Sequence, residues 1–357
     1  MHERVLIVMP SWVGDLIMAT PALRLIRDAL PDSHLTAMLR PGLDELLVGT
    51  ALVQDYLIAD ARGLFGPWHV ARTLKNHRFD TALILPNSFS TAFTVALAGI
   101  PRRIGYARDH RSLLLTERIQ APRTPNHWAI IPAVQYYIHL ARIMLGQTLT
   151  LTPPLLTSLT HAPLDLPPHT LLELAPTPDQ HAAATTLLAH AGISTRYAIL
   201  NPGGNNPAKR WPPERFAALA DHLARSHHLA ILINGSPAER DLAHAIARST
   251  TTPCTILPDL GISLGSLKAL VARAAIMITN DTGPRHIAAA LRVPLVTLFG
   301  PTDPRWTTIP THPDAPEIIL IANKDLTPEQ SANDFPHTSR IDRITLDEVI
   351  AAVDQLL

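Results

Sequence analysis

A carboxylate at the start of a predicted helix is the first residue of this 357-residue chain that could do chemistry. The segment 10–15 (PSWVGD) follows an apolar run and ends in Asp15. An acid at this place commonly caps a helix or complements its dipole. At the mouth of a cleft, the same carboxylate could act as a general base and take a proton from a hydroxyl group. The segment has a single glycine, which disfavours the G-x-G-x-x-G turn of a dehydrogenase.

A second candidate segment, 201–212 (NPGGNNPAKRWP), lies between a predicted strand and a predicted helix. Gly204 lets the backbone approach an anion closely, and Asn205 lies on the same loop. Lys209 supplies a compact positive charge that suits a phosphate group or a developing oxyanion. The alternative is an ordinary surface loop with exposed cations. The agreement of loop, charge and position favours anion binding.

A third segment, 279–286 (TNDTGPRH), also joins a predicted strand to a predicted helix. Thr282, Gly283 and the free N–H groups of the helix can form a cradle for an anion. Asp281 either caps this helix or contacts the ligand. His286 lies in the first helical turn. The chain has 18 histidines, so the position of His286, rather than its residue type, supports ligand contact.

One acidic residue, one turn segment and a set of basic residues complete the candidates. Glu239 follows a strand and could accept hydrogen bonds from ribose hydroxyls, although a first-turn helix acid explains it equally well. The segment 300–304 (GPTDP) is predicted to be a structural turn. The N-terminal half carries basic side chains, some of which we expect to bind acidic groups of a ligand. These are Arg62, Arg72, Lys75, Arg102, Arg103, Arg108, His110 and Arg111.

The bulk composition excludes several classes of protein. The formal net charge of +0 argues against bulk attraction to nucleic acid or to a membrane. Cys254 is the single cysteine, so no disulfide within the chain is possible and a reducing compartment fits. No signal peptide is visible. The most apolar long stretch, 128–145, contains Pro132, Gln135, His139 and Arg142, which disfavours a membrane span. We therefore expect a cytoplasmic protein.

The candidate segments require two sheets to position them. Apolar runs at 4–9, 34–39, 55–58 and 81–85 alternate with helical periodicity at 16–30 and 90–97. A second alternation of the same kind runs from 197 to 299. This pattern predicts an α/β protein of two Rossmann-like domains with parallel sheets, whose ligands lie at the carboxyl ends of the strands.

The Pro-, Thr- and Leu-rich segment 146–170 has no periodicity and marks the boundary between the domains. We place an N-terminal domain at 1–165 and a C-terminal domain at 166–340. A C-terminal helix at 341–357 is expected to pack back toward the N-terminal domain.

Several motifs, in the right order over nearly the whole chain, resemble those of the ADP-heptose:lipopolysaccharide heptosyltransferases, glycosyltransferase family 9. PSWVGD at 10–15 and LPNSFSTAF at 85–93 are most similar to heptosyltransferase II. PAKRWPPERF at 207–216, NDTGPRHIAAAL at 280–291 and LFGPTDP at 298–304 resemble motifs of the C-terminal half of the family.

The resemblance implies a glycosyltransferase-B fold, in which two Rossmann-like domains face a central cleft. It implies inverting transfer of L-glycero-D-manno-heptose from ADP-heptose to the heptosylated inner core of lipopolysaccharide. Asp15 matches the proposed base, and Lys209 matches a lysine near the donor phosphates. No Asp-x-Asp motif stands out, so no metal and no cofactor are expected. The partners would be the nucleotide-sugar donor, a heptose-bearing Kdo-lipid A acceptor and the inner face of the inner membrane, contacted peripherally, with no nucleic acid.

The remaining site residues follow from the same resemblance. We expect the donor to be bound by Gly204, Asn205, Glu239, Asp281, Thr282, Gly283 and His286. We expect the acceptor to be bound by Ser11, Trp12, Gly14, Asn87, Ser88 and Arg103.

Two departures from the family pattern bear on specificity. Pro284 and Arg285 stand where relatives often carry apolar residues, and residues 305–345 lack the cysteines common in type II relatives. Heptosyltransferase I, or another family 9 glycosyltransferase, is therefore an alternative. A nucleotide-sugar epimerase and a non-catalytic sugar-nucleotide binding protein are alternatives of other classes.

Overall fold

The computed structural model describes residues 3–59, 63, 65–123, 128–147, 171–310, 312, 314–323 and 339–357. Its contacts divide the chain into two compact units. The first comprises Met1–Leu156, Leu164–Glu173 and Trp306–Ile309, and the second Thr157–Pro163, Leu174–Arg305 and Pro310–Leu357. The expected domain boundary at 165/166, and Arg62 among the basic residues, lie outside the described residues.

The first unit is built on a parallel sheet with the strand order β3-β2-β1-β4-β5-β6. The strands are β1 (Arg4–Val8), β2 (His34–Leu39), β3 (Asp55–Ile58), β4 (Thr81–Ile84), β5 (Arg102–Tyr106) and β6 (Glu117–Ile119). The chain leaves β1 toward one edge and leaves β4 toward the other. The carboxyl ends of β1 and β4 are level, because Val8 pairs with Ile84. This point is where ligands bind in doubly wound sheets.

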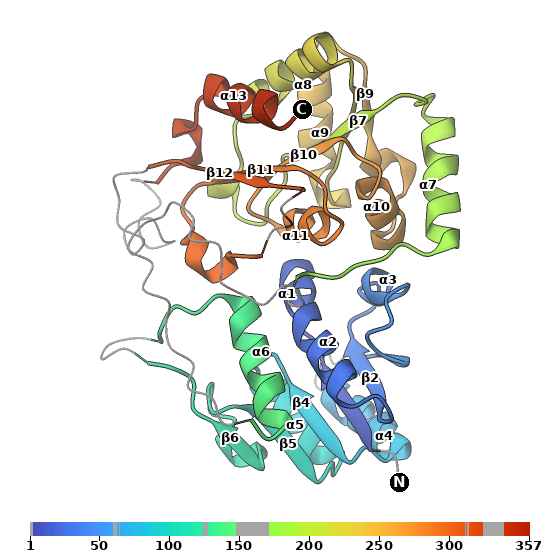
Figure 1. Cartoon of the computed structure of the whole chain (residues 1–357), viewed down its shortest axis with the longest axis vertical. Coiled ribbons are helices and arrows are strands. Elements are labelled where there is room, and N and C mark those ends of the chain that lie inside the picture. The colour runs from blue at the N-terminus through green and yellow to red at the C-terminus, as the bar shows by residue number, and fades with distance from the viewer. Residues whose placement is uncertain are drawn as a thin grey trace. The chain divides into compact units, whose positions relative to one another are not determined.

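Helices cover both faces of this sheet. They are α1 (Val13–Met18), α2 (Thr20–Ala29), α3 (Asp44–Leu47), α4 (Gly66–His77), α5 (Phe89–Leu97) and α6 (Ala133–Met144). In Figure 1, α2 and α6 lie in front of the strands, with α4 and α5 behind them. Sequence periodicity predicted one helix over 16–30, but the structure has α1 and α2, separated at Ala19. Pro21 lacks an N–H group, and the hydroxyl of Thr20 donates instead to the carbonyl of Ile17 at 2.7 Å.

The second unit repeats the same topology. Its sheet has the order β12-β11-β10-β7-β8-β9, so β7 and β10 take the central places held by β1 and β4 in the first unit. The strands are β7 (Tyr197–Asn201), β8 (Ala230–Ile233), β9 (Cys254–Ile256), β10 (Ile276–Asn280), β11 (Leu295–Phe299) and β12 (Glu317–Ile321). Asn201 pairs with Thr279, which brings the ends of β7 and β10 together. The expected fold class is confirmed.

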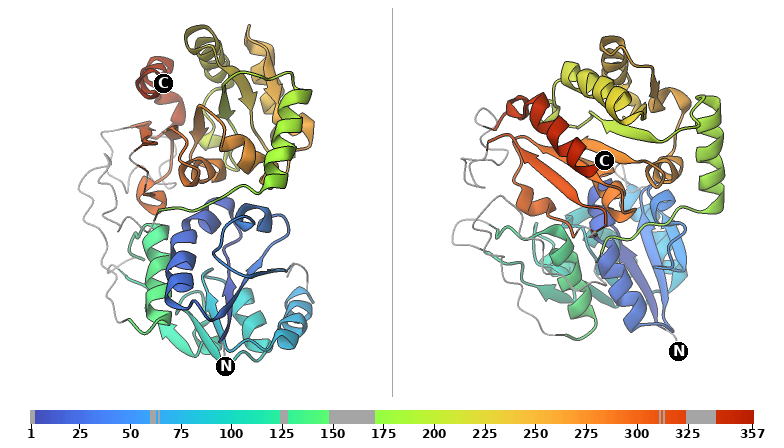
Figure 2. Two further views of the ribbon diagram at one scale, coloured as in Figure 1. Left: turned by 45° about the vertical axis from the view of Figure 1, so that its right-hand side comes forward. Right: turned by 45° about the horizontal axis from the view of Figure 1, so that its top comes forward.

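The second unit's helices are α7 (Pro178–His190), α8 (Pro213–His227), α9 (Arg240–Ser249), α10 (Leu264–Val271), α11 (Gly283–Ala290) and α13 (Leu346–Leu356). The C-terminal helix α13 was expected to pack toward the N-terminal domain. It instead packs within the second unit, on α8, β11 and β12 (Figure 2). Its apolar side chains explain this, because Val349, Ala352 and Val353 enter the second unit's core. Among the described residues, no helix combines the length and apolarity needed to cross a membrane.

Trp211 anchors the Lys209 loop to this C-terminal region. Its side chain is fully buried, and its indole N–H donates to the carbonyl of Ile344 at 2.8 Å. The ring also packs edge-to-face on Phe216, with 5.0 Å between the ring centroids. A short 3₁₀ turn, η3 (Pro207–Lys209), immediately precedes it.

We predict that Trp211→Ala destabilises the second unit by about 3–5 kcal/mol, because it leaves a large cavity and removes a buried hydrogen bond. Thermal unfolding followed by tryptophan fluorescence and circular dichroism measures this loss. Trp12→Ala is the matched control, because Trp12 is 64% exposed. Equal melting temperatures for the two variants would show that Trp211 does not anchor the loop.

Candidate active site at the carboxyl ends of the central strands

Asp15 lies in the first turn of α1, just beyond the carboxyl end of β1. The hydroxyl of Tyr137, from α6, donates to Asp15 Oδ1 at 3.2 Å. Burial, followed by the nearby charge of Asp15, raises the pKa of Tyr137 well above its ordinary value, so this hydroxyl remains a donor. The helix dipole and a neighbouring hydroxyl therefore both stabilise a half-buried carboxylate.

The expected acceptor residues Asn87 and Ser88 follow β4 and lie beside the β1 end. Asn87 donates to the Tyr136 hydroxyl at 3.1 Å and accepts from Arg111 Nη2 at 3.0 Å. Ser88 caps α5 through a hydrogen bond from the Thr91 N–H at 3.4 Å. Arg111 also donates to the backbone carbonyls of Pro86 and Tyr106. Its buried guanidinium thus fixes the turn after β4, and burial lowers the pKa of Arg111 to about 10.

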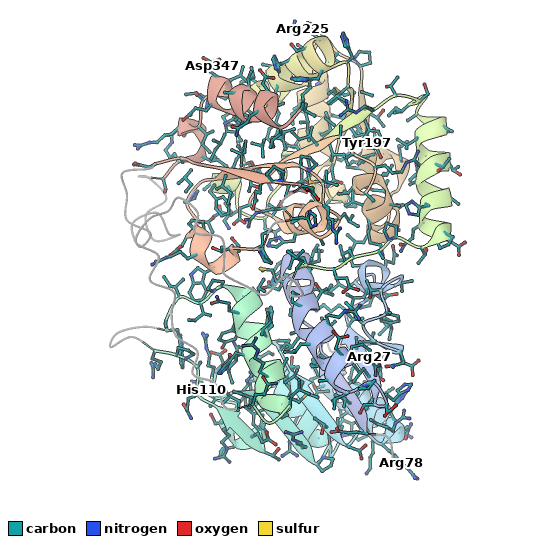
Figure 3. The ribbon with its side chains drawn as sticks, viewed as in Figure 1. Arg27, Arg78, His110, Tyr197, Arg225 and Asp347 are labelled. Carbon is teal, nitrogen blue, oxygen red and sulfur yellow. The ribbon has the colours of Figure 1, made fainter. Side chains whose placement is uncertain are left out.

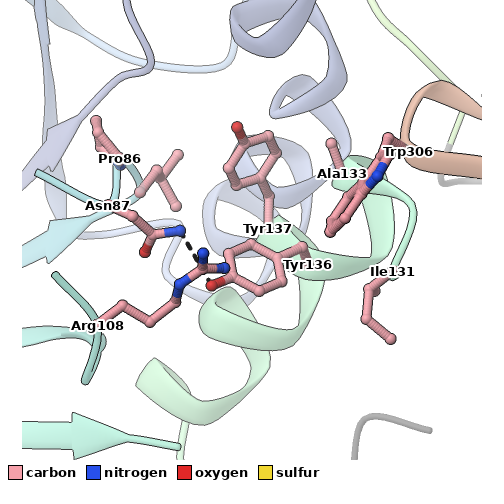
Figure 4. Close-up of a pocket in the computed structure, with 9 residues that line it drawn as sticks. Pro86, Asn87, Arg108, Ile131, Ala133, Tyr136, Tyr137 and Trp306 are labelled. Carbon is pink, nitrogen blue, oxygen red and sulfur yellow. Dashed lines mark hydrogen bonds between the residues drawn. The ribbon is translucent and has the colours of Figure 1, made fainter. Parts of the chain in front are cut away.

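A cavity of about 150 Å³ opens next to Asp15 and its partner Tyr137 (Figure 4). It is lined by Leu85, Pro86, Asn87, Arg108, Ile131, Ala133, Tyr136, Tyr137 and Trp306. The guanidinium of Arg108 lies 4.3 Å from the ring centroid of Trp128, which holds its charge at this wall. Aromatic rings with a few polar groups are typical of sites that bind sugars or other amphipathic ligands.

A second cavity, of about 210 Å³, lies at the same ends of the strands and includes Ser11 and Ser88. Arg40, from the end of β2, and Val70, Thr91 and Thr94, from α4 and α5, also line it. The other expected acceptor residues next to Ser11 differ in exposure. Trp12 is largely exposed, whereas Gly14 is buried inside α1.

Arg103 is the expected acceptor residue that the structure does not bring to this place. It lies near the amino end of β5, paired in register with Ala82 of β4. Its guanidinium donates to the carbonyls of Leu114 at 2.7 Å and Ile100 at 2.6 Å. Arg103 therefore ties together backbone at the opposite end of the sheet. Arg108 and Arg111, together with Arg40, lie at the carboxyl ends.

Buried amides organise the corresponding place in the second unit. Asn201, at the end of β7, donates to the hydroxyls of Thr279 at 3.0 Å and Thr282 at 2.9 Å. Asn234, after β8, donates to Asn201 Oδ1 at 2.7 Å. Asn280, at the end of β10, donates to the carbonyls of Pro202 and Gly203 at 2.7 and 3.1 Å. Three strand ends and two loops are thus held by side-chain hydrogen bonds.

Glu239 lies against the glycines of the 201–212 loop. Its Oε1 accepts from the Gly204 N–H at 2.6 Å, and its Oε2 accepts from the N–H and hydroxyl of Ser236. A Cβ on Gly203 would lie 2.4 Å from this carboxylate, so the glycine is needed for the approach. The anion held by the glycine loop is therefore Glu239 itself. Burial opposes the charge, but these hydrogen bonds hold the pKa of Glu239 below its ordinary value.

Lys209 and Asp281 belong to a row of alternating charges. Lys209 Nζ lies 3.8 Å from Asp281 Oδ2, and Asp281 Oδ1 lies 3.5 Å from Arg285 Nη1. Arg285 is fully buried and paired with Glu317 of β12 at 2.6 Å. Burial would raise the pKa of Glu317, but the charge of Arg285 and its hydrogen bonds keep the pKa below its ordinary value. Arg285, a departure from the family pattern, thus balances two buried acids.

The start of α11 is open to an anion. Thr282 is the N-cap residue, but its side chain makes no hydrogen bond to the helix N–H groups. Its hydroxyl is engaged by Asn201. Gly283, which has no side chain, is the first residue of the helix. Lys209, on the neighbouring loop, pairs with Asp281, which comes just before the helix. Uncapped N–H groups, the helix dipole and a nearby ammonium together suit a phosphate group.

His286 and Asn205 differ from the other expected donor residues. His286 is 3% exposed, inside the first turns of α11, and burial together with the charge of Arg285 lowers its pKa to about 3. It is therefore neutral near pH 7. Asn205 is exposed on the loop beyond Gly204.

Sequence reasoning missed Tyr137 and Asn234, and it gave no role to Asn201, Asn280 and Arg285, although these three lie within the candidate segments 201–212 and 279–286. The amides share one signal that could have found them, because each stands at or just after the end of an apolar strand run. Tyr137 gave no such signal, since it lies within an apolar helix.

A possible metal-ligand set lies away from the strand ends. Asp354 Oδ1, on α13, accepts from His222 Nε2 at 2.8 Å and from His227 Nε2 at 2.7 Å, both on α8. These hydrogen bonds join α8 and α13 on the surface of the second unit.

Two doubly wound units, each with polar groups at the carboxyl ends of its central strands, have the GT-B fold of solved heptosyltransferase structures. Residues 68–335 match glycosyltransferase family 9 (heptosyltransferase), and the chain belongs to this family. It is similar to lipooligosaccharide heptosyltransferase 2 of Haemophilus ducreyi, with 30% identity over 372 residues and 99% of each chain covered.

Other relatives are also similar to this chain over nearly their full length. Lipopolysaccharide heptosyltransferase 2 of Escherichia coli K12 is 28% identical over 365 residues, covering 99% of this chain and 98% of that protein. The solved structure of E. coli ADP-heptose lps heptosyltransferase II has a TM-score of 0.77 and 25% identity, with 99% and 98% of the chains covered. A family 9 glycosyl transferase from Veillonella parvula has a similar fold, with a TM-score of 0.79, 22% identity and coverages of 99% and 97%.

The buried neutral His286 predicts a pH dependence of stability. Its pKa of about 3 lies below the ordinary value of 6.5, so the unfolded chain binds a proton that the folded protein excludes. This contribution to stability is complete above pH 6.5 and falls by about 2 kcal/mol between pH 7 and pH 5. We expect the melting temperature of His286→Asn to fall less over this range than that of the wild type.

His181→Gln is the matched control, because His181 is exposed on α7. Its melting temperature should follow the wild-type pH profile. The same slope in His286→Asn would mean that His286 is protonated in the folded protein.

Proposed function

We propose that this enzyme transfers L-glycero-D-manno-heptose from ADP-heptose to the heptosylated inner core of lipopolysaccharide, with inversion at the anomeric carbon. The observation that carries the proposal is the similarity to type 2 heptosyltransferases over the full chain. The chemistry of both sites agrees with it. The open start of α11 beside Lys209 suits a diphosphate, and Asp15 beside Tyr137 suits the deprotonation of a hydroxyl group.

In the proposed reaction Asp15 takes the proton from an acceptor hydroxyl. The hydroxyl oxygen forms a bond to the anomeric carbon of heptose, while the bond from that carbon to the β-phosphate oxygen breaks and ADP leaves. A single displacement of this kind inverts the anomeric configuration, through an oxocarbenium-like transition state. Tyr137 positions the base, since its hydroxyl donates to Asp15 Oδ1.

The departing ADP gains negative charge, which positive groups must stabilise. We assign this role to Lys209 and to the N–H groups at Thr282 and Gly283. Asp281 would keep Lys209 in place, because the two side chains lie 3.8 Å apart. Our proposal includes no metal ion and no cofactor.

Glu239 remains a candidate ribose contact. Among the described residues its carboxylate accepts three hydrogen bonds, whereas two carboxylate oxygens can accept about four. One further hydroxyl group can therefore donate to it without breaking the loop.

We assign the acceptor to the N-terminal domain, 1–165, and the donor to the C-terminal domain, 166–340. Asn87, Arg108 and the aromatic cavity next to Tyr137 would contact the acceptor core. Because this acceptor is carried on lipid A, we place the enzyme in the cytoplasm, in peripheral contact with the inner face of the inner membrane.

We predict that Asp15→Asn lowers kcat for acceptor-dependent ADP release by about 10²–10⁴-fold, because the amide cannot take the proton. ADP release from ADP-heptose is measured with and without a Kdo-lipid A acceptor that bears one heptose. Asp347→Asn is the matched control, because Asp347 is also a first-turn helix acid and is exposed. If Asp15→Asn reacts at the wild-type rate, Asp15 is not the base, and its carboxylate only interacts with the dipole of α1.

The same assay separates the alternative functions. Turnover with Kdo-lipid A that lacks heptose would indicate a type I enzyme. ADP release without any acceptor would indicate an epimerase-like reaction, and its absence under all conditions would indicate a binding protein.

We predict that Lys209→Met lowers kcat by about 10²–10³-fold, because the charge on the leaving ADP loses its ammonium partner. Steady-state kinetics at saturating acceptor measures this effect. Arg196→Met removes an exposed cation of the same unit and should leave kcat unchanged. If Lys209→Met raises KM alone, Lys209 binds the donor equally in the ground state and the transition state.

A further inference from the structure

Helix α5 has two apolar faces, although only one of them is needed for packing. Ala92 and Val95 are buried against the sheet of the first unit. Phe89, Phe93 and Leu97 form a second stripe at i, i+4 and i+8, and they are 51%, 41% and 41% exposed. Phe89 and Phe93 stack on one another, with 6.2 Å between ring centroids and 8° between their planes. An exposed apolar stripe of this kind marks a surface that contacts something else.

The neighbouring helix α4 extends this surface. Phe65 and Trp68, at its start, are 67% and 56% exposed. Helices α4 and α5 contact each other and enter the same hydrophobic core through Val70 and Val95. Because both pack on one face of the sheet, their outer stripes point to the same side. We call Phe65, Trp68, Phe89, Phe93 and Leu97 the α4–α5 face.

The α4–α5 face is flanked by positive charge. Arg72 and Lys75 are exposed and continue the stripe from Trp68 at helical spacing. Arg78 follows at the end of α4, where it projects from the ribbon (Figure 3). Neither helix contains an acidic residue. Aromatic rings beside Arg and Lys are the combination that binds to the interface of an anionic bilayer.

The same two helices line a cavity at the ends of the strands. Val70 of α4 and Thr91 and Thr94 of α5 face the cavity that contains Ser11 and Ser88. The α4–α5 face and the cavity are therefore separated only by the thickness of these two helices. A bilayer bound to the α4–α5 face would bring a lipid-linked acceptor to this cavity.

From these observations we infer that the α4–α5 face docks the enzyme on the headgroup region of an anionic phospholipid bilayer. Phe65, Trp68, Phe89, Phe93 and Leu97 enter the interface, and Arg72, Lys75 and Arg78 bind lipid phosphates. This inference rests on the proposed function, because that function supplies an acceptor held in a membrane. A second copy of the chain is the competing occupant, but the basic side chains would then repel one another across a symmetric contact.

The test is sedimentation of the full-length enzyme with vesicles of phosphatidylethanolamine and phosphatidylglycerol. Trp68→Ser/Phe93→Ser should weaken binding at least tenfold, and Trp68→Phe/Phe93→Trp should restore it. Arg72→Glu/Lys75→Glu should weaken binding by more than tenfold, at about fivefold per cation removed. The matched control is Arg225→Glu/Arg248→Glu, which reverses two exposed charges on α8 and α9 and should bind as the wild type does.

Three outcomes would overturn the inference. The wild type could fail to bind vesicles, the variants of the α4–α5 face could bind as tightly as the wild type, or the wild type could be a dimer that Trp68→Ser/Phe93→Ser separates. Transfer to an acceptor without acyl chains keeps the proposed function distinguishable. For transfer to this acceptor, kcat should be the same in Trp68→Ser/Phe93→Ser as in the wild type. If the wild type does not transfer heptose to it, the result counts against the proposed function and not against the docking face.

Discussion

The architecture of the second unit depends on partners for the NH2 groups of three amide side chains that are almost completely buried. In the described part of the chain the oxygen of one of them, Asn234 Oδ1, accepts no hydrogen bond. Asn201, Asn234 and Asn280 stand where β7, β8 and β10 end, and burying an amide without partners would cost about 1–3 kcal/mol each. Their hydrogen bonds reach Thr279, Thr282 and the backbone of the glycine loop. The same bonds fix the loops in one arrangement, so the requirement to satisfy the amides also shapes the anion site.

Charge imposes a similar constraint around α11. Arg285 is buried, so it must be paired, and Glu317 and Asp281 provide the two partners. Asp281 in turn lies near Lys209, so the ammonium group of the 201–212 loop is linked through Asp281 and Arg285 to β12. The glycine loop is also matched to a charge from within the chain, because the carboxylate of Glu239 accepts a hydrogen bond from the Gly204 N–H and lies against Gly203. Positive and negative groups therefore alternate from β12 to the loop.

Much of this organisation could be predicted from the sequence, because buried parallel strands are continuous apolar runs. The run at 34–39 corresponds at both ends to the buried strand β2, and the last strand of the second alternation, which ends at 299, is the buried β11. The run at 55–58 matches the edge strand β3 at both ends. The strands β5 and β6 escaped prediction because charged residues interrupt their apolar runs. Arg102 of β5 and Glu117 of the edge strand β6 pair at 2.6 Å. Arg103 was assigned to the acceptor site from the family resemblance, which does not show at which end of a strand a side chain lies. Partners such as Tyr137 and Asp15, 122 residues apart, require the tertiary fold.

The hydrogen bond between Trp211 and Ile344 joins residues 133 positions apart, and this separation matters while the chain is being made. At about 5–20 residues per second, the ribosome needs on the order of ten seconds to add Ile344 after Trp211. During this interval the indole N–H lacks its carbonyl partner, and α13, which contributes to the same hydrophobic core, has not yet been made. The segment containing Lys209 is thus among the last parts of the second unit to be fixed. In a nascent chain, the indole N–H cannot form its buried hydrogen bond until most of the second unit has been made.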